Sequence, residues 1–586
     1  MNDYFVKIAY FSMEVGLEED VPTYSGGLGI LAGDTLKSCA DLHLPVVGMT
    51  LLQGKGYFIQ KLDAKGNQSE EPVNWDPSFS MKQLPYRVKV RIGGREVAIQ
   101  AWRYMIRGET DAAVPVYFLD TNVEDNHPED REITSYLYGG DHAYRFKQEI
   151  VLGIGGVRML RAMGYDRLTT YHMNEGHASL LTLELLRENE KSPEAVWFEQ
   201  ARWDPESVKD LCVFTTHTPV PAGHDRFEND LVKKLLGEKK ENLQGEEDPY
   251  LIHKIPFEVV DNLSGKGKFN MTLLALNLSR YANGVAKKHG QVSKEMFPEY
   301  EIDSITNGVH VRTWMSKEFQ ALMDKYVRGW KTDSFMLRQA MGIPPEEVWT
   351  AHQQCKKKLF DYIHRTTGVD LDPEVLTIGF ARRAAAYKRG DLLFRDIKRL
   401  KEILEKAGKF QLVYAGKAHP RDEPGKALIR KIIQHSHELA DTIPIVYLEN
   451  YDFALGRLLT SGVDVWLNNP KRPQEASGTS GMKATLNGVI NFSVLDGWWI
   501  EGHREGITGW SIGPRPSSVP PGADTDALDV QDLYEKLEEV ILPTYYHKRE
   551  DWIGIMLNGI SLNGSFFNTN RMMLQYVSSA YLRRLG

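Results

Sequence analysis

Apolar strand segments alternate with amphipathic helical segments throughout the second half of the chain. Short runs of mostly apolar residues, typical of buried strands, span 374–381, 410–418, 443–450, 463–469 and 490–498. Helical stretches such as 391–407 and 425–440 separate most of these runs. Alternation at this spacing predicts βαβ units, and therefore a parallel sheet with helices on its faces. The pattern restricts this half of the chain to the α/β class.

The first half carries a less regular mixture of strand and helix signals. Strands are predicted over 6–13, 168–174 and 210–217, with a hairpin over 86–102 around Gly93-Gly94. Apolar residues at three- and four-residue spacing predict helices over 28–42, 146–163 and 176–189. These elements again indicate an α/β domain.

A chain of 586 residues is too long for one hydrophobic core, so two or more domains are expected. The segment 341–372 is charged, mostly helical in pattern and lies between the two halves. We therefore predict an N-terminal domain over 1–350 and a C-terminal domain over 351–565. The final stretch, 566–586, is typical of an amphipathic helix that needs a surface on which to lie.

The composition excludes several classes of protein. The formal net charge of -8 argues against a general nucleic-acid or anionic-membrane binder. Cys39, Cys212 and Cys355 lie far apart without CxxC spacing, which argues against a disulfide framework and a cysteine zinc site. The first residues lack a signal-peptide pattern, and no apolar run reaches the length of a membrane span. We expect a cytoplasmic protein that binds neither nucleic acid nor membrane.

Polar residues follow several of the predicted strands. In open parallel sheets, ligands bind beyond the carboxyl ends of the strands. The residues at these ends are His217, Arg382, Arg383, Lys417, Glu449 and Tyr451. Two such edges that face each other would form a cleft, which is a common ligand site.

Two segments suggest anion binding. "SGGLG", residues 25–29, lies between a strand and a helix, where glycines let backbone N–H groups approach an anion; a simple tight turn is the alternative. "ARRAAAYKRG" places Arg382, Arg383, Lys388 and Arg389 just after a strand. A solvated basic surface is the usual meaning of such a run, but three alanines between the charges and the acidic protein around them favour a phosphate site.

Two histidine-containing segments follow strands of the first half. "YHMNEGHASL" carries His172, Glu175 and His177, but the histidines are five apart, whereas the HExxH zinc signature needs four. No metal is therefore expected, and Glu175 and His177 are predicted to bind a substrate through hydrogen bonds. "TTHTPVP" ends a strand at His217. His217 is either a structural histidine or a functional one in a cleft.

The segment "EASGTSGMKATLNGV", residues 475–489, gathers glycines and hydroxyls around Lys483. On its own it is compatible with a loop and a helix N-cap at Ser480. Its hydroxyls and backbone N–H groups are also suited to hold a phosphate, and Lys483 is either a plain charge or a Schiff-base amine. The ATP-binding pattern GxxxxGK[ST] is not matched.

Taken together, and in the order in which they occur, these segments resemble motifs of the α-glucan phosphorylases. The chain resembles a short form of that family. "NEGH" resembles the family's Asn-Asp-x-His, "TTHT" its Thr-Asn-His-Thr, and "ARRAAAYKR" its Val-Lys-Arg-Ile-His-Glu-Tyr-Lys-Arg. "LENYDFAL" is similar to Leu-Glu-Asn-Tyr-Arg-Val-Ser-Leu, and residues 475–497 resemble Glu-Ala-Ser-Gly-Thr-Gly-Asn-Met-Lys with the Leu-Asn-Gly and Leu-Asp-Gly that follow. "SGGLG", "ITNGV" at 305–309 and the terminal "RMMLQY" also match, so the resemblance covers most of the chain.

The resemblance implies two Rossmann-like domains facing a central cleft, the GT-B architecture, with the C-terminal helix crossing back to the N-terminal domain. It implies pyridoxal 5'-phosphate on Lys483, whose phosphate stands against inorganic phosphate. It implies reversible phosphorolysis of terminal α-1,4-linked glucose from glycogen, starch or maltodextrin, which gives α-glucose 1-phosphate with retention of configuration. A homodimer is possible by the same resemblance.

The resemblance also assigns roles to residues. The cofactor would contact Arg382, Thr479, Gly478, Gly27 and Tyr451 besides Lys483. Inorganic phosphate would face Arg383 and Lys388. The sugar would contact His217, Glu475, Ser477, Gly478, Gly27 and Leu28, and the His217 backbone carbonyl would stabilise the positive charge of an oxocarbenium-like glucosyl. Lys483, Arg383, Lys388, His217 and Glu475 would thus form the catalytic set.

Some positions depart from the family pattern. Arg382 stands where the family has Lys, which keeps the charge and changes its shape. Ser480-Gly481 replaces Gly-Asn, Glu175 replaces Asp, and Asp452 replaces Arg. The start of the chain has no counterpart of the helices that carry phosphorylation and nucleotide-effector sites, so we expect no control by AMP.

Two rival functions remain open at this point. A nucleotide-sugar-dependent glucan synthase shares the fold and the glycine-rich loop but does not need Lys483. A glucan-binding protein without catalysis would not need the set Arg382, Arg383 and Lys388. The preferred glucan, its chain length and the direction of the reaction in the cell do not follow from the sequence.

Overall fold

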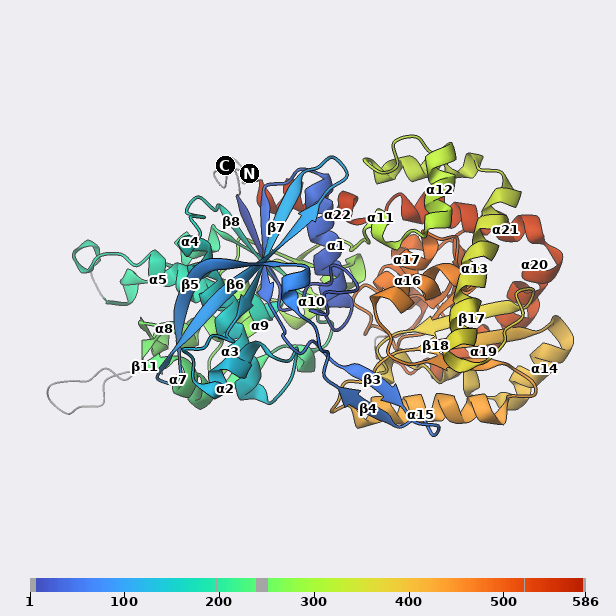
Figure 1. The fold of residues 1–586 in the computed structure, drawn as a ribbon, viewed down its shortest axis with the longest axis horizontal. Coiled ribbons are helices and arrows are strands. Elements are labelled where there is room, and N and C mark those ends of the chain that lie inside the picture. The colour runs from blue at the N-terminus through green and yellow to red at the C-terminus, as the bar shows by residue number, and fades with distance from the viewer. Residues whose placement is uncertain (1–6, 197–198, 239–250, 521, 583–586) are drawn as a thin grey trace.

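The computed structural model describes residues 7–196, 199–238, 251–520 and 522–582. Over these residues the chain forms two large sheets, each with helices packed around it (Figure 1). The strands of the first sheet lie between residues 8 and 304, and those of the second between residues 376 and 512. The predicted α/β class is therefore confirmed.

The first sheet has nine strands within the described residues. In spatial order they are β16 (Asp303–Ser304), β15 (Tyr281–Gly284), β9 (Cys212–Thr215), β8 (Thr170–Asn174), β1 (Ile8–Phe11), β2 (Val46–Leu51), β7 (Ala113–Asp120), β6 (Arg95–Arg107) and β5 (Lys82–Ile92). From β16 to β7 all neighbours are parallel, and β6 and β5 add the predicted hairpin as an antiparallel edge. The central strand β1 is buried along its whole length, as expected for a parallel strand covered on both faces.

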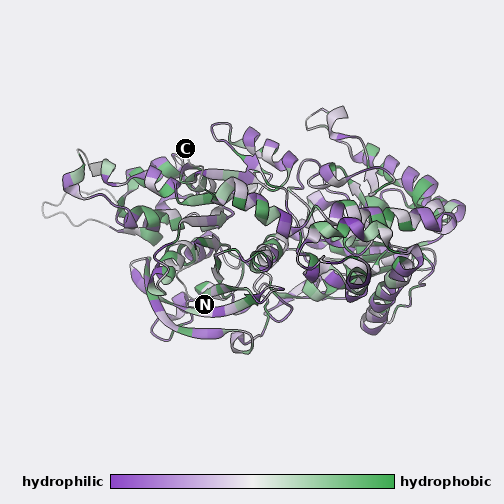
Figure 2. Ribbon diagram, turned by 90° about the horizontal axis from the view of Figure 1, so that it is seen from above, coloured by the Kyte–Doolittle hydropathy of each residue, from purple (hydrophilic) through white to green (hydrophobic). Residues whose placement is uncertain are grey.

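The second sheet has six strands in the described part of the chain, and all are parallel. Their spatial order is β19 (Ile445–Leu448), β18 (Phe410–Ala415), β17 (Leu376–Ala381), β20 (Val465–Asn468), β21 (Ile490–Val494) and β22 (Gly509–Ile512). The five strands predicted in this half are confirmed; β22 was not predicted. Helices α14 (Ile397–Ala407) and α15 (Glu423–Glu438) flank the sheet. Hydrophobic and hydrophilic residues alternate along such outer helices (Figure 2), as an amphipathic cover requires.

The helices of the first half follow the prediction with local changes. Helix α1 spans Gly27–Asp41. The predicted helix over 146–163 is divided into α3 (His142–Ile150) and α4 (Gly156–Ala162) by a wider π-helical turn at Val151–Gly155. A side chain at Gly153 would lie 2.6 Å from the backbone nitrogen of Leu181, so this turn packs closely against α5 (Leu181–Glu188).

The segment between the two sheets packs with the second sheet. Helices α11 (Val311–Trp314) and α12 (Lys317–Tyr326) contribute to the same hydrophobic cluster as β17 and β20. The long helix α13 (Pro345–Thr367) occupies the predicted boundary and packs against α16 (Phe453–Gly462). The domain limits at 350 and 565 stay predictions.

The end of the chain returns to the first sheet. Helix α22 (Thr569–Tyr576) packs against α1 (Figure 1), and Ser38 Oγ lies 2.6 Å from Thr569 Oγ1. Met572 and Met573 are buried in one cluster with Leu36. The predicted terminal helix extends to 586, and residues 583–586 lie outside the described residues.

A small hairpin reaches in the opposite direction, from the first half to the second. It consists of β3 (Ile59–Leu62) and β4 (Gln68–Glu71) and lies beside α15 (Figure 1). Gln60 Nε2 donates to the Gly416 carbonyl at 2.9 Å, and Gln68 Nε2 donates to the Ala418 carbonyl at 2.9 Å. Both carbonyls follow β18, so the hairpin is fixed at the carboxyl edge of the second sheet.

Within the described residues, no helix is both long and apolar enough to cross a membrane.

Candidate active site

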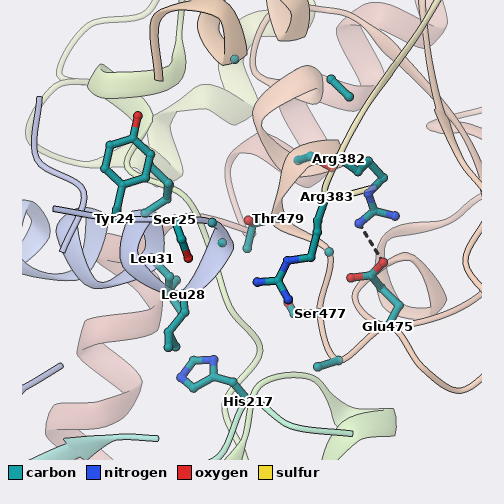
Figure 3. Close-up of a pocket in the computed structure, with 18 of the residues that line it drawn as sticks. Tyr24, Ser25, Leu28, Leu31, His217, Arg382, Arg383, Glu475, Ser477 and Thr479 are labelled. Atoms are coloured by element: carbon teal, nitrogen blue, oxygen red, sulfur yellow. Dashed lines mark ion pairs between the residues drawn. The ribbon is translucent and has the colours of Figure 1, made fainter. Parts of the chain in front are cut away.

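A pocket of about 340 Å³ is lined by residues that follow strands of both sheets. Of the predicted site residues, it is lined by Gly27, Leu28, His217, Arg382, Arg383, Lys388, Tyr451, Glu475, Ser477, Gly478, Thr479 and Lys483. Figure 3 shows Leu28, His217, Arg383 and Thr479 around the same space. Segments that are far apart in the sequence thus meet at one site.

The glycine-rich segment forms the N-terminus of α1 at the pocket wall. Helix α1 begins at Gly27, and no side chain caps its first turn, so its first N–H groups have no partner inside the helix. Glu14 holds the preceding loop from behind, because its Oε2 accepts the backbone N–H groups of Ser25 at 2.5 Å and Gly26 at 3.3 Å. A side chain at Gly26 would approach Arg383 Nη2 to 3.6 Å. The loop therefore presents backbone to the space around Arg383.

His217 is held by two side chains at the end of β8, from its last residue, Asn174, and from the next residue, Glu175. The backbone N–H of His217 donates to Glu175 Oε2 at 2.7 Å, and its Nε2 lies 2.7 Å from Asn174 Oδ1. Since an amide oxygen only accepts, Nε2 carries the proton. Burial lowers the pKa of His217 to about 3, so the ring is neutral at physiological pH. His217 is therefore a neutral group with a fixed tautomer.

Glu175 and His177 do not line the pocket, although the sequence predicts that they bind substrate. The Glu175 carboxylate also accepts the backbone N–H of Gly176 at 2.8 Å and the Thr218 hydroxyl at 3.0 Å. His177 Nε2 accepts the backbone N–H of Met13 at 2.9 Å. In this structure both side chains hold the backbone of loops instead of facing the pocket.

Two of the cations that follow β17 meet at one carboxylate. Glu475 Oε2 lies 2.7 Å from Arg382 Nη2 and 2.5 Å from Lys388 Nζ, and Figure 3 marks the pair with Arg382. Burial alone would raise the pKa of Glu475, but Arg382 and Lys388 outweigh it and lower the pKa to about 2. Arg389, the last cation of the segment, pairs instead with Asp529 at 2.7 Å. The pocket thus concentrates positive charge around one ionised carboxylate.

The segment from Ser477 to Lys483 also lines the pocket. Gly478 adopts φ +87°, a conformation that glycine tolerates, and helix α17 (Thr479–Thr485) begins directly after it. Among the described residues, the buried Ser477 Oγ has no hydrogen-bond partner. A buried hydroxyl at a pocket wall is suited to bind a polar ligand.

The structure also gives a reason for the Ser480-Gly481 departure. The Ser480 hydroxyl accepts from Trp466 Nε1 at 3.1 Å. A side chain at Gly481 would lie 2.3 Å from Asn491 Oδ1, so only glycine fits without a shift. The pair is therefore matched to the packing of this chain.

Lys483 is buried at the base of the pocket. Its Nζ lies 3.7 Å from the centroid of the Trp314 ring, at the distance of a cation–π contact. Burial lowers the pKa of Lys483 to about 8, and Asp34 partly offsets this effect. A usable fraction of the amine is therefore unprotonated near neutral pH.

Several lining residues were missed by sequence reasoning. Tyr24, Tyr57 and Trp314 line the pocket, as do Lys417 and Asp452, which were noted from the sequence without a role in the site. Burial lowers the pKa of Lys417 to about 8, and its Nζ donates to the Phe58 carbonyl at 2.9 Å. Lys417 was noted only as a polar residue after a strand. Trp314 lies soon after "ITNGV", which was the one available signal.

No group of three or more His, Cys, Asp or Glu side chains in the described ranges is arranged to hold a metal ion.

Comparison with known proteins agrees with this geometry. The family described as carbohydrate phosphorylase matches residues 158–507. The chain is 40% identical to a maltodextrin phosphorylase of Thermococcus litoralis, over 99% of this chain and 71% of that protein. It is 37% identical to a glycogen phosphorylase of Mycobacterium tuberculosis, over 98% of this chain and 70% of that protein, and 35% identical to one of Aquifex aeolicus, over 100% and 87%. This chain belongs to the carbohydrate phosphorylase family.

Proposed function

We propose that this chain catalyses the reversible phosphorolysis of terminal α-1,4-linked glucose in α-glucans, giving α-glucose 1-phosphate with retention of configuration. The names of its relatives, maltodextrin and glycogen phosphorylase, support the reaction. The observation that carries the proposal is one pocket in which a buried lysine, three cations after β17 and a glycine-rich helix N-terminus converge.

The lining of the pocket supports the binding of pyridoxal phosphate, on which this family generally depends. Lys483 offers a buried amine with a pKa of about 8 to an aldehyde. Arg382, Thr479, Gly478, Gly27 and Tyr451 would hold the rest of the group. When bound, the cofactor would supply a phosphate group able to exchange a proton with inorganic phosphate.

The residues of the chain would divide the remaining work. Arg383 and Lys388 would hold inorganic phosphate, whose proton passes to the glycosidic oxygen while the C1–O bond breaks and a phosphate oxygen bonds C1. Glu475, Ser477 and Gly478 would bind the glucose hydroxyls, with Gly27 and Leu28 beside them. The unpartnered Ser477 Oγ supports this role.

His217 would act on the sugar from the other side. Its backbone carbonyl would face the developing positive charge at C1, and its neutral ring would bind a sugar hydroxyl. Glu175 fixes the backbone N–H of His217, and His177 fixes that of Met13. We therefore propose that Glu175 and His177 are positioning residues.

The wider fold supports the GT-B arrangement. Two sheets meet at the pocket through their carboxyl edges, and α22 packs on α1. The three cysteines are free and buried, which suits a reducing, cytoplasmic environment. A homodimer stays a prediction that sedimentation would test.

The test is to assay the purified protein and a Lys483→Ala variant with maltodextrin and phosphate. The wild type is expected to release glucose 1-phosphate, to absorb in the near ultraviolet and to carry a borohydride-fixed cofactor on Lys483. Lys483→Ala is expected to lose all three. A colourless wild type that uses ADP-glucose and ignores phosphate would favour the glucan synthase, and full phosphorolysis by Lys483→Ala would overturn the cofactor assignment.

A further inference from the structure

Asp34 is a buried carboxylate beside the pocket for which the proposed function has no use. It lies on α1, and its Oδ2 accepts the indole N–H of Trp314 at 2.8 Å and the backbone N–H of His310 at 3.1 Å. Its Oδ1 has no hydrogen-bond partner among the described residues. Burial raises the pKa of Asp34, whereas Lys37, Lys483 and His310 oppose this rise. A buried carboxylate that is only half satisfied is costly, so its ionised form needs a positive partner.

Three basic side chains, Lys37, His310 and Lys483, lie near enough to Asp34 to affect its charge, and two of them are already engaged. Lys37 Nζ donates to the Leu17 carbonyl at 2.6 Å and lies 3.2 Å from Thr313 Oγ1. The His310 ring lies 2.8 Å from Asp41 Oδ2 and 2.7 Å from Thr313 Oγ1. The third basic side chain is Lys483.

Asp34 and Lys483 share Trp314. The indole donates to Asp34 from its edge, while Lys483 Nζ lies 3.7 Å from the centroid of the same ring. A hydrogen bond to the indole N–H fixes the ring in place and makes its face more negative, which strengthens a cation–π contact. The carboxylate, the ring and the amine thus form one connected unit.

We infer that Asp34 is the positioning residue of Lys483: it fixes Trp314 against the Lys483 Nζ and supplies the negative charge that keeps a proton on this nitrogen. The inference rests on the proposed function, in which Lys483 carries the cofactor. Asp34, from the first half of the chain, would then act as the counter-charge of the nitrogen that links Lys483 to the cofactor.

The experiment follows the absorption band of the bound cofactor in full-length holoenzyme across a pH series. Asp34→Asn keeps the shape of the side chain and removes its charge. Because a positive nitrogen loses its counter-charge, the pH midpoint of the spectral change is expected to fall by about one unit. Trp314→Phe keeps a ring and removes the N–H donor, so it is expected to shift the midpoint in the same direction by less.

Asp41→Asn is the matched control. Asp41 is also on α1 and also contacts the 310–312 segment, through His310 Nε2 and Arg312 Nη2, but it does not pair with Trp314. Its variant is expected to keep the wild-type midpoint. The inference is overturned if Asp34→Asn and Trp314→Phe both keep that midpoint, or if Asp41→Asn moves it as far as Asp34→Asn does.

Failure of the inference differs from failure of the proposed function. If Lys483 does not carry the cofactor, borohydride fixes no adduct on Lys483 in the wild type and there is no band to titrate. If only the inference fails, the adduct and the band are present and the midpoints of wild type and Asp34→Asn coincide. Should Asp34→Asn fail to fold, Trp314→Phe against Asp41→Asn decides the question.

Discussion

The two walls of the pocket use their carboxylates differently. On the wall that follows the second sheet, Glu475 projects into the pocket and pairs directly with Arg382 and Lys388. On the wall that follows the first sheet, Glu14 and Glu175 bind backbone N–H groups of the loops that carry Ser25 and His217. The second sheet therefore presents charged side chains, and the first sheet presents backbone held in place.

This difference separates two tasks. Charged side chains bind a charged ligand and stabilise charge that develops in the transition state. Loops held by buried carboxylates contribute position, and a small displacement of such a loop lowers the rate without removing a contact. Substitutions on the two walls should accordingly affect different kinetic constants, and the following predictions test that division in order of decreasing effect.

Arg383→Ala should give the largest loss. In the proposed reaction Arg383 would hold the phosphate, so removing its guanidinium is expected to lower kcat/KM for phosphate by about 10³-fold. Arg383→Lys should recover part of the loss, because it restores the charge without the planar fork. Initial rates of glucose 1-phosphate release over a phosphate series measure both variants. A loss confined to KM for the glucan would contradict the assignment.

Glu475→Gln should lower kcat about 100-fold without raising KM for phosphate. The amide no longer neutralises Arg382 and Lys388, so these cations stay available to phosphate, while the hold on the sugar weakens. Ser477→Ala, on the same wall, is the milder companion and is expected to lose about tenfold in kcat. A parallel rise in KM for phosphate in Glu475→Gln would show that Glu475 supports phosphate binding instead.

Glu175→Gln tests the first-sheet wall. It weakens the hold on the His217 backbone, so kcat is expected to fall about tenfold while KM for phosphate stays unchanged. Glu188→Gln is a suitable control, because Glu188 pairs with Arg161 away from the pocket. If Glu175→Gln changed the phosphate dependence as strongly as Arg383→Ala, the division between the two walls would fail.

Asp496→Asn should have the smallest effect and should appear in stability. Asp496 accepts the backbone N–H of Glu475 at 2.9 Å, and burial raises its pKa to about 7. Because the folded-state pKa is raised, the stability it contributes is complete below its unfolded pKa near 4 and is lost as pH rises to about 7. Wild-type Tm should therefore fall by a few degrees between these pH values relative to Asp496→Asn, as measured by scanning calorimetry. Parallel Tm curves for the two proteins would be evidence against this linkage.

Much of the second half was predictable from the sequence because its strands are short apolar runs with polar residues directly after them. Those residues meet because the carboxyl ends of parallel strands share one edge of the sheet. Arg382 and Lys388 were therefore found by their place in the pattern, whereas Glu475 was assigned only by the family resemblance of residues 475–497. Strand β22, a short segment after a turn, had no such signal.

The orientation of individual carboxylates was not predictable. Glu175 follows β8 in the same way that Arg382 follows β17, yet its backbone adopts φ +85°, and its carboxylate accepts backbone N–H groups of its own loop and of the His217 loop. A positive φ at a residue other than glycine depends on tertiary contacts. The role of Asp34 was not predictable for a related reason, since in the sequence it is one polar residue within a predicted helix. Its partner Trp314 lies on a distant segment.

Helix α22 also determines when the first half of the chain can finish folding during synthesis. Synthesis proceeds from the N-terminus, so β1 and α1 leave the ribosome long before residues 569–581 are made. Leu36 of α1 is buried in one cluster with Met572, Met573 and Tyr576, so the nascent first half exposes this apolar surface until the last segment arrives. A chain that stops before Thr569 would leave this apolar surface uncovered permanently, so truncated forms are expected to be prone to aggregate.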